Sequence, residues 1–282
     1  MDYICGLLKE QSMSYGLLKG KKGIIFGALD ENSIAWKVAE RAAEEGAEFV
    51  LTNAPIALRM GEINKLAEKT GAKVIPADAT DNDDLEKLFV ESQEVLGGKI
   101  DFVLHSIGMS PNVRKKKEYT DLNYDFYKKT IDISALSFHR ILATAKKLDA
   151  INEWGSVVGL SYIAAQRTFP DYSDMAEAKS VLESIARSFG YHYGNAKNVR
   201  INTISQSPTM TTAGKGIKGF GGFYNYANEM SPLGNAPSID CANYVLSLFS
   251  DFTKYVTMQN LFHDGGFSNV GISKTVMDKF ED

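Results

Sequence analysis

Short apolar segments alternate with longer amphipathic segments along nearly the whole of this 282-residue chain. The apolar segments, each read as a strand, are residues 22–27, 48–52, 72–77, 100–108, 154–161 and 199–206. The helical segments between them are residues 33–45, a stretch from about residue 56, and residues 83–95, 122–148 and 171–194. Strands separated by long helices form a parallel sheet with helices on both faces. The pattern therefore predicts the α/β class, a single doubly wound parallel sheet (Rossmann-type) of about seven strands.

No segment rich in proline or serine interrupts this alternation, so the chain is predicted to hold one such domain rather than two. Residues 1–14 are predicted to be an N-terminal extension, and residues 15–282 a single Rossmann-type domain. One irregular stretch, residues 213–223, contains five glycines. Because glycine leaves the backbone conformationally free, this stretch predicts either a flexible substrate lid near residues 209–230 or an ordinary surface loop.

Composition excludes several classes of protein. A formal net charge of −4 argues against binding to nucleic acid, and no apolar run is long enough to span a bilayer. The first residues lack the basic start and the cleavage site of a secretory signal, so we expect a cytoplasmic protein that has no membrane partner. Cys5 and Cys241 cannot build a disulfide framework, and no Cys/His spacing resembles a metal site, so no metal is expected.

The first predicted strand ends at a glycine that opens a loop and a helix. In open parallel sheets, ligands bind beyond the carboxyl ends of the strands, where the strand order reverses. Gly27 allows a tight turn under such a ligand, and a helix beginning at Ser33 and Ile34 offers unpaired N–H groups to a pyrophosphate. This is not the G-x-G-x-x-G fingerprint, so an N-capped helix after an ordinary loop is the alternative. No acidic residue ends the second strand. Arg59 is either a contact for a 2′-phosphate or a solvated charge, so the sequence leaves the choice between NADH and NADPH open.

Other predicted strands also end in small or polar residues. Asp78 and Ala79 follow the third strand, where the carboxylate is a candidate acceptor for an adenine amine. Ser106, Ile107 and Gly108 form the end of the fourth strand, after FVLH, where a ribose has room against the backbone. Ser161 and Tyr162 lie at the end of the fifth strand, and Ser207, Pro208 and Thr209 follow the sixth. Because these ends meet at one edge of the sheet, they predict a ligand crevice rather than a purely structural sheet.

Residues 172–179 read YSDMAEAK and contain a tyrosine and a lysine seven positions apart. A helix advances about 100° per residue, so this offset places Tyr172 and Lys179 on one helix face, about two turns apart. A hydroxyl and a cation then face the same ligand. The alternative for an isolated pair is a half-buried core tyrosine and a solvated lysine. A second pair, Tyr193 and Lys197, encloses a glycine and an asparagine that predict a helix end, so we do not expect that pair to be catalytic.

Six motifs stand along the chain: G-x5-S-x-A at residues 27–35, HSIG at 105–108, LSY at 160–162, YSDMAEAK at 172–179, VRINTIS at 199–205 and DGGFS at 264–268. Together they closely resemble the bacterial NADH-dependent enoyl-acyl carrier protein reductases, which belong to the short-chain dehydrogenase/reductase superfamily. The Tyr-x6-Lys spacing distinguishes this family from the Tyr-x3-Lys of most superfamily members. The resemblance runs from about residue 15 to about residue 271.

The resemblance implies reduction of trans-2-enoyl-acyl carrier protein thioesters to saturated acyl thioesters by NADH, with NADPH less expected, as the final reductive step of fatty-acid elongation. It implies that Tyr172 binds the thioester carbonyl and stabilises the enolate, that Lys179 holds the nicotinamide ribose and supplies positive charge, and that Tyr162 assists the carbonyl or shapes the pocket. The implied dinucleotide contacts are Gly27, Ser33, Ile34, Asp78, Ala79, Ser106, Ile107, Gly108, Lys179, Thr209 and Thr211. The implied acyl contacts are Met109, Tyr162, Met175, Ala213, Ile217 and Phe220, and for the five apolar ones a plain core position is the alternative.

The sequence departs from the family in three places. Ala54 stands where a cofactor-contacting glutamine is common, and Ser207 replaces a glycine. Of the basic cluster that the resemblance implies for docking an acidic carrier protein, Lys215 and Lys218 remain, but glycines occupy the later positions. Docking shifted toward the basic run at residues 114–117 is the alternative, although such runs are usually solvated loops.

The shared superfamily fold leaves two other functions open. One is a ketoacyl or other carbonyl reductase, and the other is a non-catalytic dinucleotide-binding protein, against which Tyr162, Tyr172 and Lys179 argue. The resemblance also implies acyl carrier protein as a partner and a homo-tetramer in which helices of the 171–194 type pack across a two-fold axis. The polar tail that ends at residue 282 is a candidate to pack on a neighbouring subunit.

Overall fold

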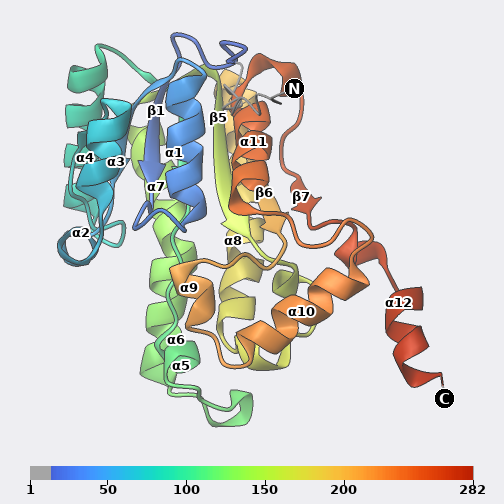
Figure 1. The fold of residues 1–282 in the computed structure, drawn as a ribbon. Helices are drawn as coiled ribbons and strands as arrows, with labels where there is room; N and C mark the ends of the chain where they lie inside the picture. The colour runs from blue at the N-terminus through green and yellow to red at the C-terminus, as the bar shows by residue number, and fades with distance from the viewer. Residues whose placement is uncertain (1–13, 282) are drawn as a thin grey trace, which may run out of the picture.

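A computed structural model describes residues 14–281 of the chain, which are built on one sheet of parallel strands (Figure 1). The sheet has seven strands in the order β3-β2-β1-β4-β5-β6-β7. These strands are β1 (Lys22–Phe26), β2 (Glu48–Thr52), β3 (Lys73–Val74), β4 (Ile100–His105), β5 (Ile151–Ser161), β6 (Arg200–Gln206) and β7 (Asn260–His263). The predicted α/β class and parallel sheet are confirmed. The predicted extension, residues 1–14, lies outside the described residues except for Ser14.

The longer helices are α1 (Ile34–Glu44), α3 (Ile63–Thr70), α4 (Asn82–Leu96), α6 (Tyr124–Ile131), α7 (Ser137–Lys147), α8 (Met175–Lys197), α10 (Phe220–Met230) and α11 (Ser238–Phe249). The short ones are α2 (Pro55–Met60), α5 (Pro111–Arg114), α9 (Thr212–Lys215) and α12 (Lys274–Met277). A π-helical stretch, Asp132–Leu136, joins α6 to α7, and one 3₁₀ turn, Pro170–Tyr172, precedes α8. Over residues 14–281, no helix has both the length and the apolar character that a membrane span requires.

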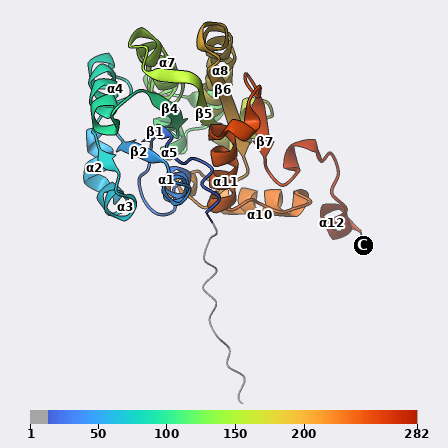
Figure 2. The ribbon, with the colours of Figure 1, turned by 90° about the horizontal axis from the view of Figure 1, so that it is seen from above.

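Helices cover both faces of the sheet (Figure 2). One apolar cluster joins the sheet to α1, α3 and α11, and a second joins the opposite face to α4, α7 and α8. Side chains alternate between the two faces along each strand. In β1, Ile25 belongs to the first cluster, whereas Ile24 and Phe26 belong to the second. Burial on both faces explains why the strands read as continuous apolar runs in the sequence.

The strand order reverses at β1, which lies between β2 and β4. The chain leaves the carboxyl ends of β1 and β4 in opposite directions, and this is where open parallel sheets bind ligands. Gly27 follows β1 with a φ of 92°, and a Cβ at this position would lie 2.1 Å from the Ser106 carbonyl oxygen, which follows β4. Only glycine fits such a close approach in this conformation.

Three strands differ from the prediction by three residues or more. The fourth, predicted over residues 100–108, ends at His105. The third strand, predicted over residues 72–77, is reduced to Lys73–Val74. It lies at the sheet edge, and Pro76 has no N–H to donate, although Ile75 and Ala77 still donate to Leu51 and Asn53 carbonyls. The fifth strand begins earlier than predicted, at Ile151. Its pairing with β4 changes register between Ile100 and Phe102, and this irregularity accommodates the additional residues.

The long helices also differ from the prediction at their ends. The predicted helix over residues 171–194 begins at Met175 and continues to Lys197, so the expected helix end at residues 194–195 is wrong. Tyr193 and Lys197 nevertheless have structural partners. Tyr193 donates a hydrogen bond of 3.1 Å to the Leu142 carbonyl, and Lys197 pairs with Asp149. The predicted helix over residues 122–148 is continuous from α6 to α7 only through the π-helical stretch.

The C-terminal segment, residues 272–281, contacts α10, and α12 projects away from the sheet in both ribbon views (Figures 1 and 2). Ile272 is 75% exposed and Phe280 is 83% exposed. Large apolar side chains this exposed within one short segment are typical of a surface that another molecule covers.

Candidate active site

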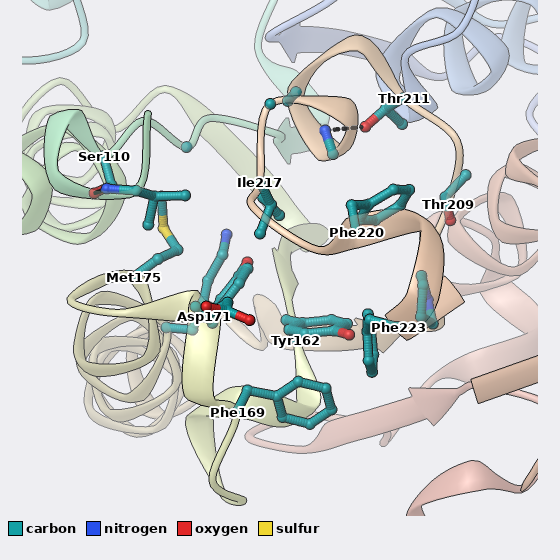
Figure 3. Close-up of a pocket in the computed structure, with 18 of the residues that line it drawn as sticks. Ser110, Tyr162, Phe169, Asp171, Met175, Thr209, Thr211, Ile217, Phe220 and Phe223 are labelled. Atoms are coloured by element: carbon teal, nitrogen blue, oxygen red, sulfur yellow. Dashed lines mark hydrogen bonds between the residues drawn. The ribbon is translucent and has the colours of Figure 1, made fainter. Parts of the chain in front are cut away.

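A cavity of about 320 Å³ lies beyond the carboxyl ends of the central strands. Its walls come from the loops after β4, β5 and β6, from the first turns of α8, and from the segment that contains α9 and α10 (Figure 3). This last segment covers most of the predicted lid, residues 209–230. The cavity therefore lies where the sequence predicts a ligand crevice.

Tyr172 lies in the turn before α8 and not on the helix itself. We predicted that one helix face carries both Tyr172 and Lys179, and that placement is wrong. Ser173 has φ 49° and ψ −142°, which no helix allows, so the helix begins only at Met175. Tyr172 and Lys179 still line the same cavity. The turn, rather than helical periodicity, brings the two side chains together.

The Tyr172 hydroxyl makes no hydrogen bond to any residue between 14 and 281, although the side chain is half-buried in the cavity wall. Its ring centroid lies 4.9 Å from that of Tyr162. Burial raises the pKa of Tyr172 well above the usual value of a phenol. The hydroxyl therefore keeps its proton at neutral pH and is available as a hydrogen-bond donor to a ligand.

Lys179 is buried, with 8% of its surface exposed, and its Nζ donates a 2.7 Å hydrogen bond to the Leu160 carbonyl oxygen. Burial lowers the pKa of Lys179 to about 8, and the nearby charge of Glu183 acts in the opposite direction. The amine is therefore mostly charged at neutral pH. A Cβ on Gly108 would lie 3.8 Å from Nζ, so the absence of a side chain there leaves the lysine open to the cavity.

Tyr162 forms the aromatic end of the cavity. Its hydroxyl is buried and has no hydrogen-bond partner among the described residues. Burial, and to a lesser degree the neighbouring Tyr172, raises the pKa of Tyr162. Phe169 and Phe223 lie beside it in Figure 3, with ring centroids 5.5 Å and 6.2 Å from that of Tyr162.

Many of the predicted dinucleotide contacts line the cavity, namely Ile34, Ser106, Ile107, Gly108, Lys179, Thr209 and Thr211. Four others do not line it. Gly27 and Ser33 lie in the adjoining β1–α1 connection, where Ser33 caps α1 by accepting from the Trp36 N–H. Asp78 bonds instead to the Thr80 hydroxyl at 2.7 Å, and Ala79 is buried in the core.

All the predicted acyl contacts line the cavity: Met109, Tyr162, Met175, Ala213, Ile217 and Phe220. Figure 3 shows Ile217 between the aromatic end and the end that carries Met175 and Ser110. Met175 packs in a small apolar cluster with Val113 and Ile217. The part of the cavity formed by these residues is therefore largely apolar, whereas polar side chains such as Ser106, Thr209 and Thr211 line other parts of its wall.

Sequence reasoning missed two aromatic residues of this wall, Phe169 and Phe223, whose ring centroids lie 4.6 Å apart. Phe223 ends the glycine-rich stretch, so its place in the suspected lid was a usable signal. Phe169 lies in the connection between β5 and α8, and nothing local distinguishes it from an ordinary loop aromatic. Lys218, singled out for carrier docking, lies at the cavity with its Nζ 3.2 Å from Glu118.

A family model described as enoyl-(acyl carrier protein) reductase matches residues 27–268. Enoyl-[acyl-carrier-protein] reductase [NADH] 1 of Rhizobium meliloti (strain 1021) is 35% identical over 259 residues, which are 91% of this chain and 93% of the relative. The enzyme named FabI of Rickettsia bellii (strain RML369-C) is 33% identical over 94% of this chain and 100% of its own length. The crystal structure of the FabI–NADH complex from Alistipes finegoldii is 65% identical, with a TM-score of 0.93 over 95% of this chain and 94% of that one. The resemblance seen in the sequence motifs is confirmed, and this chain belongs to the enoyl-(acyl carrier protein) reductase family.

Proposed function

We infer that this protein reduces trans-2-enoyl-acyl carrier protein thioesters to saturated acyl thioesters with NADH, in the last reductive step of fatty-acid elongation. The observation that carries this function is the Tyr172 hydroxyl, which is a free donor in one cavity with the buried cation of Lys179. The names of similar proteins, which are NADH-dependent enoyl reductases, support the same reaction.

The residues between β1 and β4 fit a bound dinucleotide. A Cβ on Gly27 would fill the turn. No described residue accepts a hydrogen bond from the N–H of Ile34 or Ala35, so the start of α1 has free donors for a pyrophosphate. Lys179 and Gly108 are the proposed contacts of the nicotinamide ribose. When bound, NADH supplies the hydride for the β-carbon of the substrate.

Tyr172 and Lys179 are suited to the charge that develops during this reduction. Addition of hydride at the β-carbon moves an electron pair onto the thioester carbonyl oxygen, which becomes an enolate. The protonated phenol of Tyr172 donates a hydrogen bond to this oxygen, and the Lys179 cation adds positive charge nearby. Both act within a largely buried site, where such interactions are stronger than in water. A proton taken up at the α-carbon completes the reduction.

The test of this function is turnover of NADH with crotonyl and longer enoyl thioesters. Tyr172→Phe keeps the ring but removes the donor, so kcat is expected to fall about 100-fold, the usual effect of losing one oxyanion donor. Tyr193→Phe is the matched control. It removes the hydroxyl of a buried tyrosine whose partner is the Leu142 carbonyl, far from the reaction, so it should lower stability by about 1 kcal/mol and leave kcat unchanged.

The same assays separate the alternatives. Faster turnover of 3-ketoacyl than of enoyl thioesters would make this protein a ketoacyl reductase. Tight NADH binding in calorimetry without turnover of any thioester would make it a non-catalytic dinucleotide-binding protein. Either result would overturn the proposed reaction.

We propose further that residues 209–230 act as a lid over the bound substrate. Polar contacts tie this segment to neighbouring loops. Among them, Thr212 donates a 2.6 Å hydrogen bond to Asp30, Lys218 pairs with Glu118 at 3.2 Å, and Asn235 donates a 2.8 Å hydrogen bond to the Tyr224 carbonyl. The exposed contacts of Thr212 and Lys218 contribute little stability, so they oppose opening of the segment only weakly.

Acyl carrier protein, as the bearer of the substrate, must approach the mouth of this cavity. Arg114 lines the cavity, and residues 114–117 form an exposed basic run beside it. We propose this run as the docking surface for the carrier.

A homo-tetramer and a cytoplasmic location also belong to the proposal. The exposed apolar side chains of the C-terminal segment, Ile272 and Phe280, support contact with another copy of the chain.

A further inference from the structure

Asp174 is a buried carboxylate that the proposed chemistry does not use. Its exposed fraction is 0%, and it directly follows the turn that carries Tyr172. No lysine or arginine of the described chain forms an ion pair with it, and it does not line the cavity. It also makes no capping bond at the start of α8, although it occupies the N-cap position. A buried carboxylate without a cation is unfavourable unless hydrogen bonds compensate for its lost hydration.

Three donors provide this compensation. Ser110 Oγ lies 2.6 Å from one carboxylate oxygen of Asp174, while Asn112 Nδ2 and Thr130 Oγ1 each lie 2.8 Å from the other. All three donor residues are themselves buried. Ser110 and Asn112 belong to the cap and body of α5, and Thr130 belongs to α6. The carboxylate therefore fixes the start of α8 against two other elements.

The peptide next to Asp174 is strained. Ser173 has φ 49°, a region that residues other than glycine rarely adopt, and its buried hydroxyl has no partner among the described residues. Such a conformation persists only when surrounding contacts hold it. If Ser173 relaxed to helical angles, α8 would extend backwards through Tyr172 and carry the phenol onto the helix. The hydrogen bonds of Asp174 oppose this change, together with the packing of the Tyr172 ring against Tyr162.

We propose that Asp174 is a positioning residue, whose hydrogen bonds to Ser110, Asn112 and Thr130 hold the strained Ser173 peptide and so keep the Tyr172 hydroxyl directed into the cavity. The inference deepens the proposed function and rests on it only for the role of Tyr172 in turnover. Asp174 touches neither cofactor nor substrate, so its removal should act on kcat and not on NADH binding.

The experiment compares the intact chain with Asp174→Ala, Ser173→Gly and the double variant. Asp174→Ala is expected to lower kcat with crotonyl thioester about 10-fold or more, while the Kd of NADH, followed by fluorescence, changes less than about 2-fold. Glycine adopts the Ser173 angles without strain, so Ser173→Gly should raise the kcat of the Asp174→Ala variant about 3-fold or more while changing the kcat of the intact chain little.

Glu45→Ala is the matched control, because Glu45 is a second buried carboxylate, 1% exposed. It accepts hydrogen bonds from the N–H groups of Tyr15 and Leu17, pairs with Arg41 at 3.1 Å and lies outside the cavity. Its removal should lower the Tm as Asp174→Ala does but leave kcat unchanged. The positioning role is refuted if Asp174→Ala lowers the Tm without lowering kcat. It is also refuted if the Kd of NADH rises by as large a factor as kcat falls.

Hydrogen exchange gives a readout that needs no turnover. The amides of Ala176 and Ala178 donate to the carbonyls of Ser173 and Asp174. Asp174→Ala should accelerate their exchange about 10-fold, and Glu45→Ala should not. Unchanged exchange in Asp174→Ala would overturn the proposal even if the enzyme is active. Absence of enoyl thioester turnover by the intact chain would overturn the proposed function instead.

Discussion

Burial moves the pKa values of the two groups proposed to act on the thioester in opposite directions. It raises the pKa of the Tyr172 phenol and lowers that of the Lys179 amine to about 8, since burial favours the neutral form of each. The tyrosine therefore remains a donor over a wide pH range, whereas the lysine is charged only below about pH 8. His105, in the strand beneath, is fully buried with its pKa lowered to about 3, so it adds no competing positive charge at neutral pH.

The charge of Lys179 predicts an alkaline limit to activity. The amine is protonated below its pKa of about 8 and neutral above it, so kcat/KM for NADH should decline above about pH 8. The measurement is a pH profile of kcat/KM at saturating crotonyl thioester. Lys179→Arg keeps its charge past pH 12 or so and should flatten the decline, even at lower activity. A wild-type profile that stays level to about pH 10 would contradict a role for the Lys179 charge.

At the scale of helices and strands, alternation along the chain is sufficient to predict the parallel sheet and the edge at which the cavity lies. Local sequence does not predict where a helix or strand ends when contacts with distant parts of the chain determine that end. The third strand is short because it has a neighbour on one side only, and Pro76 offers no N–H. A crevice beyond the ends of β4 and β6 was predictable, because parallel strands bring their carboxyl ends together whatever their side chains are.

The turn before α8 could not be predicted in the same way. YSDMAEAK has good helical propensity apart from its first residues, and nothing local requires Ser173 to adopt a positive φ. The bonds that stabilise this turn join Asp174 to Thr130, Asn112 and Ser110, which lie 44, 62 and 64 residues away in sequence. The motif therefore predicted two residues that line one cavity, but with the wrong local geometry.

The glycines of α10 predict how the proposed lid moves. A Cβ added at Gly221 or at Gly222 would meet no neighbouring atom within 4 Å, so alanine fits at both positions without a clash. Each Gly→Ala change should stabilise the closed helix by up to about 1 kcal/mol. If lid opening limits product release, kcat and KM of the double variant should both fall about 3-fold or more in steady-state assays.

Gly194 supplies the control for the lid prediction. It also has open space around a Cβ, but it lies near the end of α8 and outside the cavity. Gly194→Ala should raise the Tm by a similar amount and leave kcat and KM unchanged. Equal kinetics for Gly194→Ala and the Gly221/Gly222 double variant would show that the α10 segment does not gate turnover.

At the scale of the whole molecule, two clusters of apolar side chains account for the packing of helices on the sheet, but neither includes the C-terminal segment. The few links from this segment to the body include a 3.1 Å hydrogen bond from Ser273 to the Glu229 carbonyl and an ion pair between Lys279 and Glu229. Ile272 and Phe280 remain mostly exposed. An arm that buries so little of its own apolar surface gains stability only when another chain covers it.

The oligomeric state of the protein should therefore depend on this segment. The intact chain is expected to have the mass of four subunits in sedimentation equilibrium, and Ile272→Ser combined with Phe280→Ser should reduce that mass at micromolar concentration, because an interface loses its buried apolar core. Ile56→Ser is the control, since Ile56 is 67% exposed on α2, at the opposite side of the molecule. A monomeric intact chain would contradict the proposed tetramer. An intact tetramer in the Ile272/Phe280 variant would instead exclude the segment from the interface, and the exposed rings of Phe252 and Tyr255 would then be the next side chains to replace.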